Sequence, residues 1–232
     1  MKIVVIIPAL NEAGNIQRLV REVLATMPVE VIVVDNGSDD GTGEEAQAAV
    51  ARVVREPRRG YGYACAAGIA AAQDADILVF LDGDNSFLPA EIPTLVAPIL
   101  AGQSDLVLGS REQGWISPGS MPAHQRLGNR LVSRLMNRFY GLEITDLGPY
   151  RAVRRSLLQR LDMREMTFGW PAEMIVKAAG GGAHITEVPV SYRGRATGRS
   201  KVSGNLRGTF LAAWYILGVT LRYAWVQNPS KR

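Results

Sequence analysis

The feature that most constrains the fold of this chain is the alternation of short apolar runs with helix-like segments over its first hundred residues. The apolar runs predict strands at residues 2–7, 30–34, 52–54, 76–81 and 106–108. The segments after Asn11, from about Gly41, over 61–73 and after Pro89 predict helices. Because strands that alternate with helices form βαβ units, we expect an α/β fold with a mostly parallel sheet covered by helices on both faces.

The pattern changes after Ser110, where a loop rich in Gly, Pro and Ser begins. Further along we expect a helix over about 122–140, a short segment around 146–153, a strand at 185–190, a loop over 193–204 and a helix over about 206–226. No clean linker divides these parts. We therefore expect one domain over residues 1–204, with halves at about 1–111 and 112–204, followed by a C-terminal helix over 205–232.

Paired acidic residues follow the apolar run 76–81, in the sequence Asp82-Gly83-Asp84. In an open α/β sheet, ligands bind outside the carboxyl ends of the strands, so this strand delivers two carboxylates to the binding edge. Two hard oxygen ligands suit Mg²⁺ or Mn²⁺ holding a diphosphate, and Gly83 leaves room for a nucleotide. Taken alone, the tripeptide is also compatible with a solvated turn.

Polar residues also follow the first two expected strands, in Pro8-Ala9-Leu10-Asn11-Glu12 and in the run that begins Asp35-Asn36-Gly37. Asp35 can accept hydrogen bonds from a base or ribose, and Gly37 permits the sharp turn that places it there. Glu12 is placed to accept from a nucleoside hydroxyl. As an alternative, Asn11 and the pair Asp39 and Asp40 are expected to cap the helices that follow.

These three motifs, in this order and at strand ends, resemble the nucleotide-sugar-binding half of family 2 glycosyltransferases, which have the GT-A fold. The resemblance covers residues 2–111 and implies a Rossmann-like sheet. The glycine-rich turn before Gly62 comes after the third strand, which argues against a dinucleotide-binding oxidoreductase, and in the resembled family it lies beside the nucleotide. The implied donor-binding residues are Pro8, Ala9, Asn11, Glu12, Asp35, Gly37, Gly62, Asp82, Gly83, Asp84 and Arg111.

Blocks in the second half are similar to those of dolichyl-phosphate and polyprenyl-phosphate sugar synthases. They are Gly109-Ser110-Arg111, Arg126-Leu127-Gly128-Asn129, 146–151, 189–193 and 198–201. The chain departs from that pattern in having Gly-Pro-Tyr-Arg where Ser-Gly-Phe-Arg is usual, and Ser86 where Gln is frequent. The resemblance implies an inverting, metal-dependent transfer of a hexose from a nucleoside diphosphate sugar of the GDP-mannose or UDP-glucose class to polyprenyl phosphate.

The acceptor chemistry can be read from one further difference. Relatives that glycosylate hydroxyl groups tend to carry a Glu-Asp pair as general base, whereas Glu173 here is followed by Met174. A phosphate acceptor is already anionic and requires cations rather than a strong base. The residues implied for the acceptor phosphate are Arg126, Arg151, Glu173, Arg195, Arg199 and Lys201, and those implied for catalysis are Asp82, Asp84, Asp146 and Arg126.

Two alternatives remain at this point. One is transfer to a soluble or lipid hydroxyl, with Asp146 or Glu173 as base. The other is a catalytically silent module that binds nucleotide sugars, against which the intact Asp82 and Asp84 argue.

Cys65 lies in an alanine-rich helical stretch and is expected to be a small buried hydrophobe rather than a nucleophile.

Charge is distributed unevenly along the chain. The formal net charge is +4, but no Asp or Glu follows Glu187, so the last part carries +8 and the rest −4. The chain has no nucleic-acid-binding motif, and we expect no nucleic-acid partner but an anionic lipid surface or a phosphorylated substrate. The apolar first strand is too short for a signal peptide, so we expect the protein in the cytoplasm, peripherally bound to the membrane.

The C-terminal helix contains an uninterrupted apolar or neutral run over residues 208–221, flanked by Arg207 and Arg222. A bilayer span needs about 20 residues, so this run is too short to cross a membrane. Its aromatic residues and basic ends are typical of an interfacial helix, and its apolar character is equally typical of a helix that packs on the core.

Overall fold

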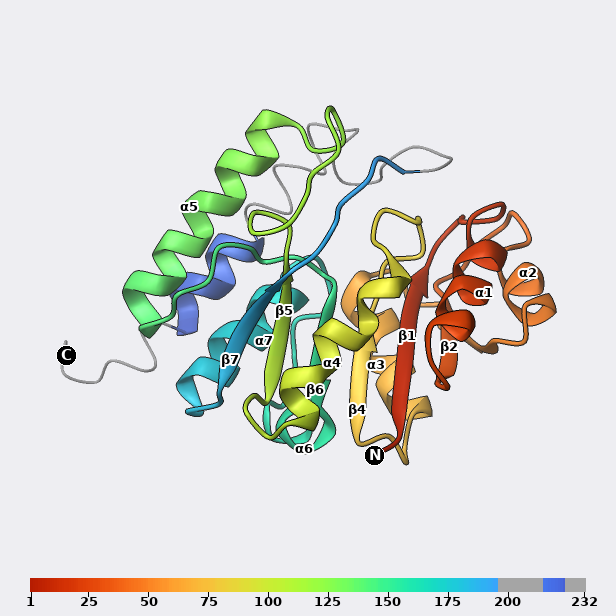
Figure 1. Cartoon of the computed structure of the whole chain (residues 1–232), viewed down its shortest axis with the longest axis horizontal. Helices are drawn as coiled ribbons and strands as arrows, with labels where there is room; N and C mark the ends of the chain where they lie inside the picture. Colours follow the sequence, from red (N-terminus) through yellow and green to blue (C-terminus); the bar gives the residue numbers. More distant parts are fainter. Residues whose placement is uncertain (196–214, 224–232) are drawn as a thin grey trace.

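The computed structural model describes residues 1–195 and 215–223, and within them the chain forms a seven-stranded sheet in the order β3-β2-β1-β4-β6-β5-β7 (Figure 1). The strands are β1 (Ile3–Ala9), β2 (Glu30–Asp35), β3 (Arg52–Arg55), β4 (Ile77–Phe80), β5 (Leu106–Ser110), β6 (Arg151–Arg154) and β7 (Ile185–Pro189). The helices are α1 (Ile16–Thr26), α2 (Thr42–Ala48), α3 (Tyr61–Ala71), the 3₁₀ turn η1 (Pro89–Glu91), α4 (Ile92–Leu100), α5 (Ala123–Tyr140), α6 (Arg155–Arg160) and α7 (Trp170–Gly180).

The expectation of a mostly parallel sheet is confirmed. β1 pairs in parallel with β2 and β4, β2 with β3, and β5 with β7, whereas β6 is antiparallel to both β4 and β5. The last register pair between β1 and β2 joins Ala9 to Asp35. The carboxyl ends of the parallel strands therefore meet at one edge of the sheet, the upper edge in Figure 1.

Side chains that alternate along the strands build a separate core on each face of the sheet. On one face, Val5 and Ile7 of β1 pack with buried residues of α1, α2 and α4. On the other, Val4 and Ile6 pack with buried residues of α3, α5, α6 and α7. Helices therefore cover both faces, as the strand and helix alternation predicts.

Helix α7 is an element that the sequence reading missed. Its buried residues Trp170, Ala172, Met174, Ile175 and Val176 occupy nearly every side of the helix, so no polar face reveals a helical period. Trp170 lies edge-on against Phe80 at the end of β4, with 4.8 Å between ring centroids. This contact packs the start of α7 against the end of β4, the strand that precedes Asp82 and Asp84.

Residues 215–223 form a helical segment, and the rest of the helix expected over 206–226 lies outside the described residues. Val219 belongs to the core on the face covered by α5 and α7. The hydroxyl of Tyr140 donates to the carbonyl of Thr220 at 2.6 Å. This segment thus packs on the body of the domain. Within the part of the chain that the structure describes, no helix is long and apolar enough to span a bilayer.

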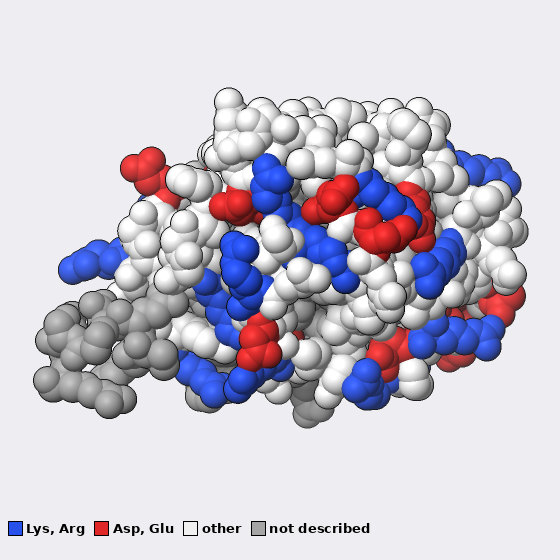
Figure 2. All heavy atoms as spheres, turned by 90° about the horizontal axis from the view of Figure 1, so that it is seen from below, with Lys and Arg blue, Asp and Glu red and all other residues white. Residues whose placement is uncertain are grey.

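The edge of the sheet opposite the parallel strands' carboxyl ends carries charges of both signs. Figure 2 views this edge, where basic and acidic side chains lie interspersed. Lys2 pairs there with Glu30 and Asp74, each at 2.7 Å, and Arg154 lies 3.6 Å from Asp105. The charges on this edge are therefore paired locally.

Candidate functional site

Three carboxylates gather at the ends of β1 and β4: Glu12, Asp82 and Asp84. The two loops touch at Gly83, where a Cβ would lie 3.5 Å from both the Cβ of Ala9 and the Cγ of Glu12. The Oδ1 atom of Asp84 accepts the backbone N–H of Ser86 at 3.0 Å, which fixes the carboxylate at the head of the turn. The structure thus brings together acidic residues that are about seventy positions apart in the sequence.

Asp82 is the most perturbed of the three. Burial, and then the charge of Asp84, raise the pKa of Asp82 to about 7. No residue in 1–195 or 215–223 forms a hydrogen bond or ion pair with its carboxylate. Asp82 is thus a buried carboxylate beside a second carboxylate, and the charges of Arg111 and Arg195 only partly offset the rise in its pKa.

One cation reaches this cluster from the segment that follows β7. The Arg195 Nη1 atom lies 3.3 Å from Asp84 Oδ2, and its Nη2 atom pairs with the carboxylate of Glu12. Burial alone would lower the pKa of Arg195, but Glu12 and Asp84 raise it above its ordinary value. Arg195, which the sequence reading assigned to the acceptor phosphate, therefore lies among the donor-side carboxylates.

A second arginine is held nearby by a buried aspartate. Asp146 is fully buried and accepts hydrogen bonds from the backbone N–H, Nε and Nη2 of Arg111 at 2.8, 2.8 and 2.7 Å. Burial would raise the pKa of Asp146, but the charge and hydrogen bonds of Arg111 hold it below its usual value. The guanidinium of Arg111 also lies over the ring of Tyr192, 5.2 Å from its centroid. Asp146 thus acts as an anchor for Arg111.

The nucleoside end of the expected site lies at the end of β2. Asp35 is almost buried, and its Oδ1 atom accepts the backbone N–H of Ser38 at 2.8 Å. Gly37, with φ of 82°, turns the chain between these two residues in a conformation that favours glycine. The side chain of Arg59 donates to the carbonyl of Gly37 at 2.8 Å. Asp35 is therefore held by the turn that its own motif forms.

Asn36 is a residue of this region that the sequence reading did not single out. Its Nδ2 atom donates to the carbonyls of Glu56 and Arg58 at 2.9 and 2.7 Å, and its Oδ1 atom accepts the N–H of Gly60 at 2.9 Å. One side chain therefore clamps the whole turn between β3 and α3. The signal available in the sequence is its position directly after a strand, next to Asp35.

Asn11 joins two loops instead of capping a helix, which corrects the capping alternative. Its Oδ1 atom accepts the N–H of Asp39 at 3.1 Å, and its own N–H donates to Ser38 at 3.0 Å. Helix α1 begins later, after Asn15. The N-cap of α2 is Gly41 and not Asp39 or Asp40, although Asp40 Oδ1 accepts the N–H of Thr42, the first residue of α2, at 3.0 Å.

Gly62 is a point of close packing between the two halves of the domain. Its N–H donates to the carbonyl of Met166 at 3.1 Å, and a Cβ at this position would lie 2.5 Å from the carbonyl oxygen of Glu165. The absent side chain of Gly62 thus lets the 165–166 segment rest on the first turn of α3.

Two of the arginines expected to contact phosphate make their printed hydrogen bonds and ion pairs to other groups of the described chain. Arg151 is fully buried, donates to the carbonyls of Pro171, Leu147 and Gly148, and has its pKa lowered to about 10 by burial. Arg126 is exposed on α5 and pairs with Glu112 at 2.8 Å. Arg199 and Lys201 lie outside the described residues.

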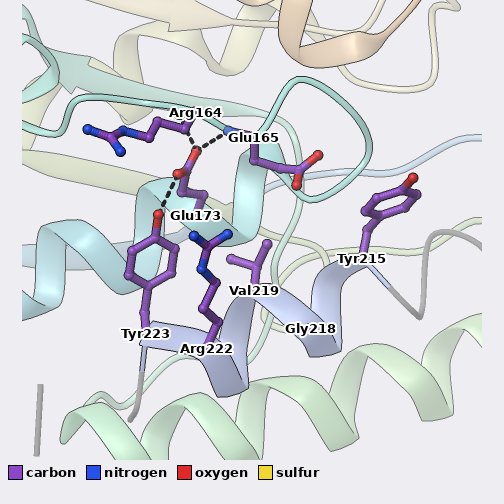
Figure 3. Close-up of a pocket in the computed structure, with 8 residues that line it drawn as sticks. All are labelled: Arg164, Glu165, Glu173, Tyr215, Gly218, Val219, Arg222 and Tyr223. Atoms are coloured by element: carbon purple, nitrogen blue, oxygen red, sulfur yellow. Dashed lines mark hydrogen bonds between the residues drawn. The ribbon is translucent and has the colours of Figure 1, made fainter. Parts of the chain in front are cut away.

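Glu173 lies on α7 beside a pocket of about 290 Å³ next to helical segment 215–223 (Figure 3). Its carboxylate accepts the backbone N–H groups of Arg164 and Glu165 at 2.9 and 2.8 Å. It also accepts from the hydroxyl of Tyr223 and pairs with Lys177, both at 2.9 Å. Burial would raise the pKa of Glu173, but these partners, Lys177 first, lower it. Its observed role is to join the 164–165 turn, α7 and the C-terminal segment.

Cys65 is fully buried, which confirms its expected place in the core, and burial raises the pKa of its thiol well above the ordinary value.

Among residues 1–195 and 215–223, no group of three or more His, Cys, Asp and Glu side chains is arranged to hold a metal ion. Asp82 and Asp84 are therefore not part of a three-residue group of this kind within the described residues.

Comparisons with known proteins agree with one another. The family model described as glycosyl transferase family 2 matches residues 4–162. An uncharacterised glycosyltransferase of Mycobacterium tuberculosis is 37% identical over 212 residues, which cover 90% of this chain and 94% of the relative. The polyprenol monophosphomannose synthase of Mycolicibacterium smegmatis is 32% identical over 231 residues, which cover 92% of this chain and 87% of that protein.

Among solved structures, glucosyl-3-phosphoglycerate synthase from Mycobacterium tuberculosis, in complex with Mn²⁺, UDP-glucose and phosphoglyceric acid, has a TM-score of 0.76 to this chain. It is 26% identical, and the match covers 97% of this chain and 80% of that one.

Proposed function

This chain belongs to glycosyl transferase family 2, and from that premise we propose that it transfers a hexose from a nucleoside diphosphate sugar to polyprenyl phosphate. The donor is of the GDP-mannose or UDP-glucose class. Its nucleoside lies at Glu12 and Asp35, and its diphosphate at Asp82 and Asp84. Support for the acceptor comes from a relative that is named a polyprenol monophosphomannose synthase and matches over nearly the whole of both chains.

One observation carries the choice of a phosphate acceptor: the carboxylates best placed by sequence to act as a general base are already engaged. Asp146 accepts three hydrogen bonds from Arg111, and its pKa is lowered. Glu173 accepts two backbone hydrogen bonds and contacts two further side chains. Both are therefore weak bases. A phosphate oxygen is anionic near neutral pH and attacks without losing a proton to the enzyme.

The residues present fit a divalent ion. Asp82 and Asp84 are neighbouring carboxylates, and burial, followed by the charge of Asp84, raises the pKa of Asp82, an effect that a bound cation would oppose. Mg²⁺ or Mn²⁺ held there would supply positive charge to the departing diphosphate. A structural neighbour that was solved with Mn²⁺ and UDP-glucose supports this choice of metal.

The proposed reaction is a single displacement. An oxygen of the acceptor phosphate forms a bond to the anomeric carbon, the bond from that carbon to the diphosphate breaks, and the nucleoside diphosphate leaves with the electron pair. Arg111, fixed by Asp146, and Arg195 provide positive charge on the path of these phosphates. The configuration at the anomeric carbon is inverted.

A second candidate is transfer to a hydroxyl group. The similarity to glucosyl-3-phosphoglycerate synthase, solved with phosphoglyceric acid, favours it. This reaction needs a base, and Asp146 and Glu173 are the candidates. A third candidate, a non-catalytic nucleotide-sugar-binding module, is disfavoured because the chain retains both Asp82 and Asp84.

We further propose that the protein works at the cytoplasmic face of a membrane, where a polyprenyl acceptor resides, with residues 1–204 as the catalytic domain and 205–232 as an appended helix. The basic balance of the last part supports attraction to anionic lipid. The packing of Val219 supports a structural role for the same helix. A truncation ending near Ser203 separates these roles. If the helix is a membrane anchor, the truncated protein should stay folded and no longer bind anionic vesicles. If the helix is part of the core, the truncated protein should unfold.

The function is tested by incubating purified protein with radiolabelled GDP-sugars and UDP-sugars and polyprenyl phosphate, with and without Mn²⁺. We expect labelled lipid from one donor class, and only with the metal. The Asp84→Ala variant should lose both this product and metal-dependent nucleotide binding. Nucleotide binding that is unchanged in Asp84→Ala would rule out the metal assignment.

A further inference from the structure

Arg195 places a positive charge against the acidic cluster formed by Glu12, Asp82 and Asp84. One guanidinium spans two carboxylates from different strands, with Nη1 at 3.3 Å from Asp84 Oδ2 and Nη2 paired with Glu12. Its Nε atom is buried and forms no hydrogen bond within the described part of the chain. The two carboxylates therefore bind the Nη1 and Nη2 atoms of the guanidinium and leave its Nε–H without an acceptor among the described residues.

The segment that delivers Arg195 is tied to the same turn as the acidic residues. We name residues 190–195 the strap. Figure 1 shows the chain after β7 running along the upper edge of the sheet towards the ends of β4 and β1. The backbone N–H of Arg193 donates to the carbonyl of Ser86 at 2.8 Å, and the ring of Tyr192 lies edge-on to Phe87 at 5.2 Å between centroids. The strap is therefore joined to the loop that carries Asp84 by a backbone hydrogen bond and an aromatic contact.

The carboxylate of Asp84 cannot bind both the guanidinium of Arg195 and a divalent ion at full strength. Arg195 takes Oδ2 of Asp84, and the N–H of Ser86 takes Oδ1. A divalent ion at Asp84 must displace the guanidinium or share an oxygen with it at the cost of repulsion between positive charges. A donor diphosphate changes this balance, because it brings negative oxygens that both a metal ion and an arginine bind.

We propose that Arg195 is a built-in counter-cation that competes with the divalent ion for Asp84, and that the donor diphosphate ends this competition by taking over the guanidinium. The inference rests on the proposed function in one respect, the placement of the ion at Asp82 and Asp84. Metal without nucleotide then binds weakly. Metal and nucleoside diphosphate bind together, and the strap moves with Arg195 from the carboxylates to the diphosphate.

Binding of Mn²⁺ tests the proposal without any measure of catalysis. The free ion is quantified by electron paramagnetic resonance in titrations of the full chain, with and without UDP or GDP. In the absence of nucleotide we expect Arg195→Gln to bind Mn²⁺ at least about fivefold more tightly than the wild type, as expected for removal of a competing ligand. With the preferred nucleotide present, this advantage should vanish or reverse, because the variant lacks the cation that holds the diphosphate.

Arg193→Gln is the matched control, since it removes the same charge from an exposed position on the strap. It should bind Mn²⁺ as the wild type does. Arg195→Lys keeps the charge but lacks the planar fork that spans Glu12 and Asp84, so its affinity for Mn²⁺ alone should lie between those of the wild type and Arg195→Gln. The proposal is overturned if Arg195→Gln binds Mn²⁺ alone no more tightly than the wild type, or if Arg193→Gln gains as much. If no protein binds Mn²⁺ under any condition, the metal site itself is rejected, a result that is distinct from an equal affinity.

Discussion

Asp146 and Arg111 form a buried two-point ion pair, in which Oδ1 and Oδ2 of the aspartate lie 2.7 and 2.8 Å from Nη2 and Nε of one guanidinium. The backbone N–H groups of Thr145 and Asp146 donate to Glu187 of β7 at 2.8 and 2.9 Å, so the pair is fixed to the sheet. This arrangement makes Asp146 a positioning residue. Asp146 holds the guanidinium of Arg111 near Asp82, and the positive charge of Arg111 lowers the pKa of Asp82.

Breaking this pair should cost stability. Asp146→Asn leaves a mostly buried guanidinium without its charge partner, and we expect the free energy of unfolding to fall by about 3–5 kcal/mol, measured by urea denaturation. Asp162→Asn is the control, because its pair with Arg164 is exposed on both sides and its loss should change stability far less. Similar losses in the two variants would contradict the anchoring role of Asp146.

Glu56 should make stability depend on pH. Hydrogen bonds from the side chain of Arg58 hold the pKa of Glu56 at about 2, below its ordinary value of 4.5. A carboxyl with a lowered folded pKa stabilises the protein fully above the unfolded pKa and loses that contribution as pH falls towards the folded pKa. The difference in unfolding free energy between the wild type and Glu56→Gln should therefore shrink as the pH falls from about 5 to about 2. A difference that stays constant over this range would rule out the contribution.

Asn36 should affect donor binding through the turn that it clamps. Asn36→Ala leaves the N–H of Gly60 and two carbonyls without their partner. We expect donor KM to rise up to about tenfold with a smaller change in kcat, and amide exchange over 56–60 to become faster. Asn137→Ala is the control, because Asn137 makes equivalent backbone bonds to Ile144 at the far end of α5. It should lower stability and leave donor KM unchanged, and a matching rise in KM would remove the special role of Asn36.

Two glycine substitutions should have opposite signs. In Gly62→Ala the new methyl would lie 2.5 Å from the carbonyl oxygen of Glu165, and backbone must shift, so we expect a loss of about 1–3 kcal/mol. In Gly128→Ala the methyl meets nothing within 4 Å on helix α5, and we expect a gain of about 0.5–1 kcal/mol. Thermal unfolding measures both. A neutral Gly62→Ala would mean that the 165–166 segment is not packed on α3 as described.

The parts of the site that could be predicted are those fixed by chain direction alone. Asp35, Asp82 and Asp84 follow buried strands, and parallel strands end at one edge, so their convergence follows from the sequence pattern. Arg195 could not be placed this way, because its contact with Glu12 spans 183 residues and depends on the path of the strap.

Other features could not be predicted for local physical reasons. Arg151 reads as an available cation, yet its guanidinium is buried and bound to backbone carbonyls, an environment that composition does not reveal. Asn36 reads as a turn residue, and its importance emerges only from the backbone groups that the turn presents to it. Helix α7 shows no helical period, because it is apolar on nearly all sides.

Two acceptors that differ by one phosphate distinguish transfer to a phosphate from transfer to a hydroxyl group. Purified protein, its preferred labelled nucleotide sugar and Mn²⁺ are supplied with polyprenyl phosphate or with the corresponding polyprenol, and labelled lipid is measured over time. We expect product from the phosphate alone, with kcat for Glu173→Gln within about threefold of the wild type, since no carboxylate base is required. Product from the alcohol, with kcat abolished by Glu173→Gln, would contradict transfer to a phosphate.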